Sequence, residues 1–109
     1  MNDKILNEIF TIIQSVTKVS RVEILSGSRI REIYFSRIIA AYWLRRYRLT
    51  FKQIAPLVGS NDPTTVMYQI KAYNNEISPF FKELAAKVAA KIATSEVLEF
   101  DKRFDINKC

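Results

Sequence analysis

Histidine is absent from the sequence, and the one cysteine, Cys109, is its last residue. Histidine is the commonest general base and metal ligand in proteins, and a zinc finger needs four cysteine or histidine ligands. Gly27 and Gly59 are the only glycines, so the chain has no glycine-rich loop to cradle nucleotide phosphates. No paired carboxylates stand out among the scattered acids. We therefore expect no enzyme activity, no metal site and no cofactor.

Long apolar runs are missing as well. No apolar stretch approaches the ~20 residues that a transmembrane helix needs. The first residues include Asp3, Lys4 and Glu8, which is unlike a signal peptide. A lone cysteine fits a reducing compartment. These features predict a cytoplasmic protein with no membrane partner.

Turn-forming residues are few, with two glycines and three prolines among 109 residues. A small all-β domain needs many turns, so this composition favours helices. The length is that of one domain, and 49% apolar residues are enough for a modest core. The sequence therefore predicts a single all-α domain of five or six helices.

Apolar residues recur at helical spacing along most of the chain. The segment near residue 40 is apolar on more than one side and is expected to be the central helix. Pro56 is expected to kink or loosen its helix, and Ile77 is expected to face the core. The patterns predict helices over residues 3–17, a short one ending before Gly27, then 31–47, 50–58, 63–77 and 80–94.

Positive charge is concentrated in one part of the chain. Residues 18–52 contain nine lysines and arginines against two glutamates, a net charge of +7, whereas the remainder carries −1. Arginine predominates, and its planar guanidinium pairs well with phosphate oxygens. This distribution favours nucleic-acid binding. Two alternatives are a solvated, solubilising surface and, less favoured because no basic amphipathic helix is present, an anionic membrane.

Two short predicted helices are arranged as a helix-turn-helix. Thr50 and Gln53 have the spacing of a capping box, Gly59 follows Ala55 by four residues, and Asp62 precedes a proline. The small residue lets two helices cross closely, and glycine permits the turn between them. Many helical hairpins share this spacing by chance, so the motif alone does not decide the function.

Polar residues on the outer side of the second helix are the candidate DNA readers, because their side chains have groups able to hydrogen-bond to base edges. Arg29 and Arg31, in a basic loop, are candidates for a minor groove. Arg37 and Arg45 are two helical turns apart and are candidates for phosphates. A solvated loop, and arginines packed beside Tyr42 and Trp43, are the alternatives. The candidate readers are Thr64, Thr65, Tyr68 and Gln69.

The order of these motifs resembles a known family. The basic Arg-x-Arg loop is followed by Phe-Ser-Arg-Ile-Ile-Ala-Ala-Tyr at residues 35–42 and by Gly-Ser-Asn-Asp-Pro-Thr-Thr-Val at residues 59–66. This is similar to the C-terminal DNA-binding domain of the bacterial replication initiator DnaA. The corresponding family stretches read approximately Phe-Pro-Arg-Gln-Ile-Ala-Met-Tyr and Gly-Gly-Arg-Asp-His-Thr-Thr-Val. The resemblance covers about residues 5–77.

The resemblance implies roles for several residues. Arg29 would enter the minor groove, Arg37 would contact the duplex and Arg45 would meet phosphate. Bases or backbone in the major groove would be contacted by Asp62, Thr64 and Thr65. The resemblance also implies a nucleoid-associated role in replication initiation and origin binding or in regulation, without the initiator's ATP-hydrolysing module.

Three departures from the family pattern affect base reading. The family's arginine is Asn61 here, its histidine is Pro63, and its glutamine is Ile38. We therefore expect a changed or relaxed sequence preference, and Ile38 could still touch a thymine methyl. The competing hypothesis is a degenerate initiator-like module that binds a protein instead of DNA.

The sequence also suggests two parts. Residues 1–78 would form the DNA-binding domain, and residues 79–109 would be an additional helix and tail that pack on it or extend from it. This C-terminal helix is the candidate surface for a protein partner or a dimer contact.

Overall fold

Side-chain caps set the starts of four helices. Ser20 and Thr50 each form a full capping box, with Glu23 and Gln53 respectively. Asp62 and Ser78 cap helices that begin with proline. These are the residues that the sequence indicates, because their oxygens accept backbone N–H groups that have no partner within the helix.

The computed structural model describes residues 3–99, all of whose regular elements are α-helices, and the all-α prediction is confirmed. Seven helices lie in this part of the chain, against the five or six expected, because the last is a separate piece of four residues. The helices are α1 (Asp3–Thr17), α2 (Arg21–Leu25), α3 (Arg31–Arg46), α4 (Phe51–Leu57), α5 (Pro63–Asn75), α6 (Pro79–Thr94) and α7 (Glu96–Glu99).

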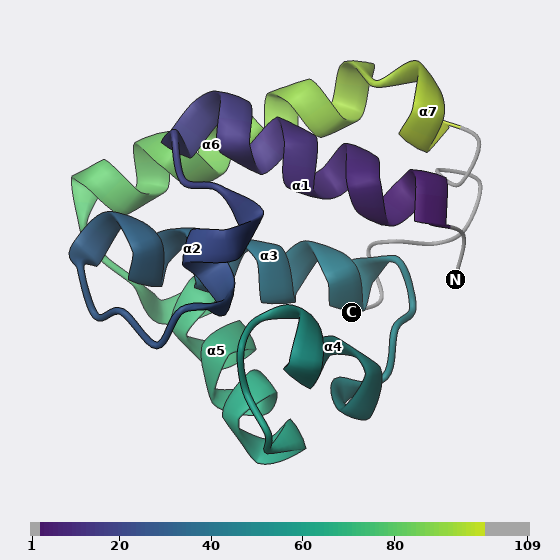
Figure 1. Cartoon of the computed structure of the whole chain (residues 1–109). Helices are drawn as coiled ribbons and strands as arrows, with labels where there is room; N and C mark the ends of the chain where they lie inside the picture. Colours follow the sequence, from purple (N-terminus) through teal and green to yellow (C-terminus); the bar gives the residue numbers. More distant parts are fainter. Residues whose placement is uncertain (1–2, 100–109) are drawn as a thin grey trace.

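Helix α3 is the centre of the fold, as predicted. Figure 1 shows α1 and α6 on one side of it, with α4 and α5 on the other and the short α2 alongside. Four consecutive residues of α3, from Ile38 to Ala41, are fully buried. Such a run is expected only where a helix packs on several sides.

Aromatic rings connect α3 to two other long helices, α5 and α6. Tyr42 of α3 stacks on Tyr73 of α5, with ring centroids 3.7 Å apart. Phe35 of α3 meets Phe81 of α6 edge-on at 5.0 Å. Burial, with the neighbouring Tyr42, raises the pKa of Tyr73 to about 12. The fixed rings hold α5 against the rest of the core.

Helix α6 completes the core instead of extending from it. It lies along α1 (Figure 1) and buries Phe81, Leu84, Val88 and Ile92. In α7, Leu98 is also fully buried. The last ten residues of the expected charged tail lie outside the described residues.

No helix among residues 3–99 has the length and apolar character needed to cross a membrane.

Two expectations from the sequence concern the ends of helices. Pro56 lies inside α4, but the helix ends at the next residue, Leu57. The prediction that Ile77 faces the core is wrong, because α5 ends at Asn75 and Ile77 is 80% exposed. The Glu76 carboxylate accepts hydrogen bonds from the N–H groups of Ile77 and Ser78, at 3.0 and 3.1 Å, which turns the chain toward α6.

Candidate nucleic-acid interface

The turn between α4 and α5 depends on Gly59. Its φ is +75°, in the left-handed region that favours glycine. The turn is closed by the Ser60 N–H, which donates to the Ala55 carbonyl at 2.8 Å. Val58 and Val66, one on each side of the turn, are fully buried. The two helices therefore form a packed helix-turn-helix, as the sequence predicts.

Gly59 also touches a helix outside this motif. A Cβ placed at Gly59 would lie 2.8 Å from the Leu25 carbonyl oxygen, near the end of α2. Real Cβ atoms do not approach backbone this closely, so both the conformation and the space require glycine. The turn between α4 and α5 therefore packs against the end of α2.

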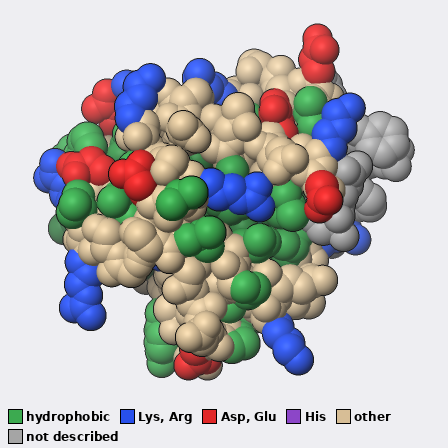
Figure 2. Space-filling model, viewed as in Figure 1, with side chains coloured by type: hydrophobic (Ala, Val, Ile, Leu, Met, Phe, Trp, Pro, Cys, Tyr) green, Lys and Arg blue, Asp and Glu red, His purple; other side chains and the backbone are tan. Residues whose placement is uncertain are grey.

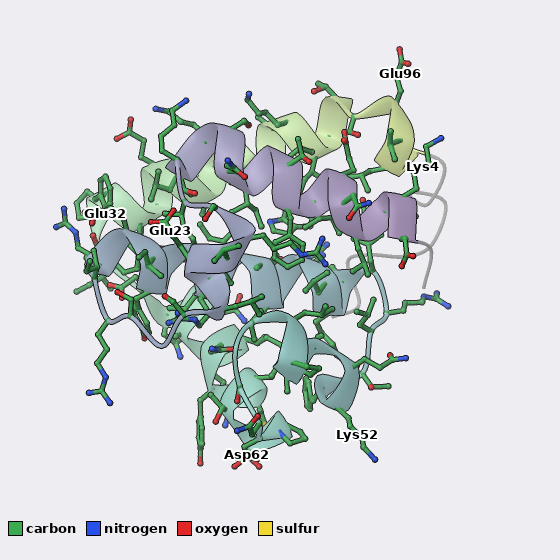
Figure 3. The ribbon with its side chains drawn as sticks, in the orientation of Figure 1. Lys4, Glu23, Glu32, Lys52, Asp62 and Glu96 are labelled. Atoms are coloured by element: carbon green, nitrogen blue, oxygen red, sulfur yellow. The ribbon has the colours of Figure 1, made fainter. Side chains whose placement is uncertain are left out.

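The first turn of α5 presents its polar side chains to solvent. The Asp62 carboxylate caps the helix by accepting from the Thr64 N–H at 2.9 Å. Figure 3 shows Asp62 at the lower end of the molecule, where Lys52 of α4 also projects. The cap uses one carboxylate oxygen of Asp62, while its neighbours keep their side chains exposed; these neighbours are Asn61, Pro63, Thr64 and Thr65.

The two arginines of the basic loop between α2 and α3 have different surroundings. Arg29 is exposed to solvent. Arg31 is also exposed, but its guanidinium lies 4.5 Å from the centre of the Phe80 ring and 3.5 Å from the Glu32 carboxylate. Figure 2 shows basic side chains projecting on both sides of the lower part of the molecule. Arg29 is therefore the better placed of the two to reach a ligand.

A cleft of about 550 Å³ joins the basic loop to α5. Arg29 is on one side, and Thr65, Tyr68 and Gln69 are on the other. The structure thus brings together residues that the sequence places 36 or more positions apart. We call this hollow the interface cleft; its lining residues are Gly27, Arg29, Tyr34, Arg37, Thr65, Tyr68 and Gln69.

Two lining residues of the interface cleft were not predicted, Gly27 and Tyr34. Tyr34 is 41% exposed and lies one helical turn before Arg37, on the same side of α3. That spacing is the signal in the sequence that would have found it. Gly27 has no such signal, because it takes part through its position in the loop.

Arg37 lies beneath the basic loop. Its Nε and Nη2 donate to the Ile24 carbonyl at 3.0 and 2.8 Å, and its Nη1 donates to the Ser28 carbonyl at 3.2 Å. Burial lowers the pKa of the Arg37 guanidinium. The group is therefore engaged with the protein's own backbone, and a direct contact with the duplex stays a prediction.

Arg45 is held elsewhere. Its Nη1 donates to the Leu49 carbonyl at 3.1 Å, and its guanidinium lies 4.7 Å from the centre of the Phe51 ring. Arg37, near the middle of α3, and Arg45, in its last turn, thus engage different backbone segments. The expected contact of Ile38 with a thymine methyl is wrong, since Ile38 is fully buried.

Comparison with known proteins gives a consistent result. The family model described as "Bacterial dnaA protein helix-turn-helix" matches residues 6–72. A curated protein of Picosynechococcus sp., "Chromosomal replication initiator protein DnaA", is 33% identical over an alignment of 87 positions, and the match covers 73% of this chain and 19% of that protein. The chain therefore spans about a fifth of the relative's length. No solved structure matches significantly.

Proposed function

The chain belongs to the family of bacterial DnaA helix-turn-helix domains, and from this membership we propose that it binds double-stranded DNA with α5 in the major groove and Arg29 in the adjacent minor groove. The interface cleft is the observation that carries this proposal. It sets the basic loop and the exposed side of α5 next to each other on one surface. In B-DNA one sugar-phosphate strand separates a major groove from its neighbouring minor groove. A protein reaching into both needs a hollow of this kind for the strand.

Specificity would come from the exposed first turn of α5. Thr64 and Thr65 offer hydroxyl groups that donate and accept, with methyl groups that suit thymine. Pro63 has no N–H and no polar side-chain atom, so it offers only apolar contact. Because Asn61 and Pro63 replace an arginine and a histidine of the family pattern, we propose that the preferred DNA sequence differs from the family's usual one.

The wider role follows from the same proposal. We propose that the protein acts at a replication origin or in the regulation of replication or transcription, and that it is associated with the nucleoid. ATP hydrolysis is not expected of these 109 residues, which have no glycine-rich phosphate loop. A protein partner or dimer contact through the C-terminal helix stays a prediction. Such a contact would have to use the outer side of α6, because its apolar side is packed in the core.

Binding to a random-sequence duplex, measured by fluorescence anisotropy over a salt series, tests the proposal. Three or four phosphate contacts would give a slope of about −3 in log K against log salt concentration. Negligible binding even at low salt would overturn the DNA proposal and favour the protein-interaction alternative. If binding occurs, selection from a random duplex library identifies the preferred sequence.

The minor-groove part is tested separately with Arg29→Ala. Arginine is attracted to the narrow, negative minor groove of A·T-rich DNA. The variant is expected to lose affinity for all duplexes and to lose most on A·T-rich ones. Lys87→Gln removes a positive charge from α6 and serves as the control. Equal affinity of Arg29→Ala and the wild type would exclude the loop from the interface.

A further inference from the structure

The hydrogen bonds of Arg37 connect distant parts of the chain. Its acceptors, the carbonyls of Ile24 and Ser28, lie thirteen and nine residues earlier in the sequence. Ile24 is in the last turn of α2, and Ser28 precedes Arg29 directly. A single guanidinium thus ties both ends of the segment that leads to Arg29 onto the central helix.

The loop has little else that ties it to the core by hydrogen bonds. Its own side-chain hydrogen bonds run between residues two or three apart, through the hydroxyl groups of Ser26 and Ser28. Such local bonds shape a turn but do not fix where the turn lies on the molecule. The bonds from Arg37 to Ile24 and Ser28 do fix the position of the loop on the molecule, because α3 is the most buried helix of the fold.

The helix-turn-helix also contacts this segment, at a different residue. The turn at Gly59 is in contact with the backbone of Leu25, the residue after Ile24. Residues 24–28 are therefore in contact with both Arg37 of α3 and the turn that precedes α5. A displacement of this segment would change the separation between Arg29 and the first turn of α5.

We propose that Arg37 is a positioning residue for DNA binding, which fixes the basic loop so that Arg29 meets the minor groove while α5 lies in the major groove. This inference rests on the proposed function. A loop already held in place does not have to be ordered when DNA binds, so less free energy is lost on association. The effect of Arg37 on affinity then passes through Arg29.

A double-mutant cycle distinguishes this role from a direct DNA contact. Arg29→Ala and Arg37→Gln are each expected to weaken binding to an A·T-rich duplex, on the order of tenfold. If Arg37 acts through Arg29, the double variant binds within about twofold of the weaker single variant. Losses that multiply would make Arg37 an independent contact and overturn the proposal. Unchanged affinity of Arg37→Gln would overturn it too.

Hydrogen exchange in the free protein gives a second readout that does not depend on DNA. Arg37→Gln is expected to speed amide exchange in residues 25–30 by several fold, while α1 and α6 keep their protection. Lys87→Gln should change neither region. Unchanged exchange in the loop would show that Arg37 does not hold it. If Arg37→Gln speeds loop exchange but the wild-type protein binds no duplex, Arg37 does hold the loop and the proposed function is rejected.

Discussion

At the scale of single residues, the arginines of the basic residues 18–52 have the same side chain but very different surroundings. Arg29 extends into solvent, Arg37 is bonded to two backbone carbonyls, and Arg45 lies on an aromatic ring. An arginine that already donates to carbonyls has fewer N–H groups left for phosphate. Counting positive charges therefore overstates how many of them are placed to meet DNA.

Thr65 and Lys52 are predicted to affect DNA binding in different ways. Thr65 is exposed on α5 beside the interface cleft, whereas Lys52 projects from α4. Base contacts specify a sequence and phosphate contacts position the protein. Thr65→Ala should alter the ranking of sequences in a duplex library, and Lys52→Ala should weaken all of them similarly. Equal, sequence-independent losses would argue against Thr65 as a reader.

Gly59→Ala is predicted to lower the free energy of unfolding by about 1–3 kcal/mol, because alanine is strained at positive φ and its Cβ would meet the Leu25 carbonyl. Urea denaturation measures the effect. Gly27→Ala is the matched control, since a Cβ there meets nothing within 4 Å. That variant should stay within about 0.5 kcal/mol of the wild type or gain slightly. Equal stability of the two variants would contradict the contact with α2.

At the scale of elements, α5 serves both the core and the candidate interface. Its inner side contributes the fully buried Val66 and the stacked Tyr73. Its outer side contributes Thr65 and the 61% exposed Tyr68. Because both sides belong to one rigid helix, packing in the core decides how the outer side chains are presented.

The cap of α5 can be tested by substituting Asp62. Asp62→Ala removes the oxygen that accepts from the Thr64 N–H and should cost about 0.5–2 kcal/mol of stability. Asp62→Asn keeps an accepting oxygen and should retain most of the stability. Thermal or urea unfolding of the two variants without DNA provides the comparison. A similar loss in both would mean that the charge of Asp62, and not the cap hydrogen bond, stabilises α5.

At the scale of the whole molecule, the core depends on a helix beyond the family match. The match ends at residue 72, yet α6 buries four apolar side chains against the rest of the fold. Phe81 is among them, in contact with the rings of Phe35 and Tyr73. We infer that the helix-turn-helix is held in shape partly from the C-terminal side.

Phe81→Ala is expected to lower the free energy of unfolding by about 3–5 kcal/mol, a large part of the total for a domain of this size. The neighbouring Phe80 is only partly buried, so Phe80→Ala should cost less. A chain ending at Ser78 should show no cooperative unfolding transition in calorimetry. A truncated chain that melts cooperatively near the wild-type temperature would show instead that α6 is dispensable.

The sequence alone determined six of the seven described helices, the four side-chain caps and the family. Capping boxes at Ser20 and Thr50, the Asp-Pro start of α5 and the apolar periodicity are local signals, which fix local structure whatever lies nearby. The resemblance to the initiator domain also followed from short motifs that are contiguous in the chain. The prediction for Ile77 was wrong because it depended on the end of α5. Ile77 would face the core if the helix continued to it, but α5 ends at Asn75 and Ile77 is exposed.

The tertiary structure decided which of the candidate residues share a surface. The interface cleft joins residues 27–37 to residues 65–69, and no periodicity in the sequence reports such a meeting. Burial of Ile38 and the bonds of Arg37 likewise depend on neighbours from other helices. Contacts between segments arise from the packing of whole helices, so the environment of a side chain is settled only once those helices are placed.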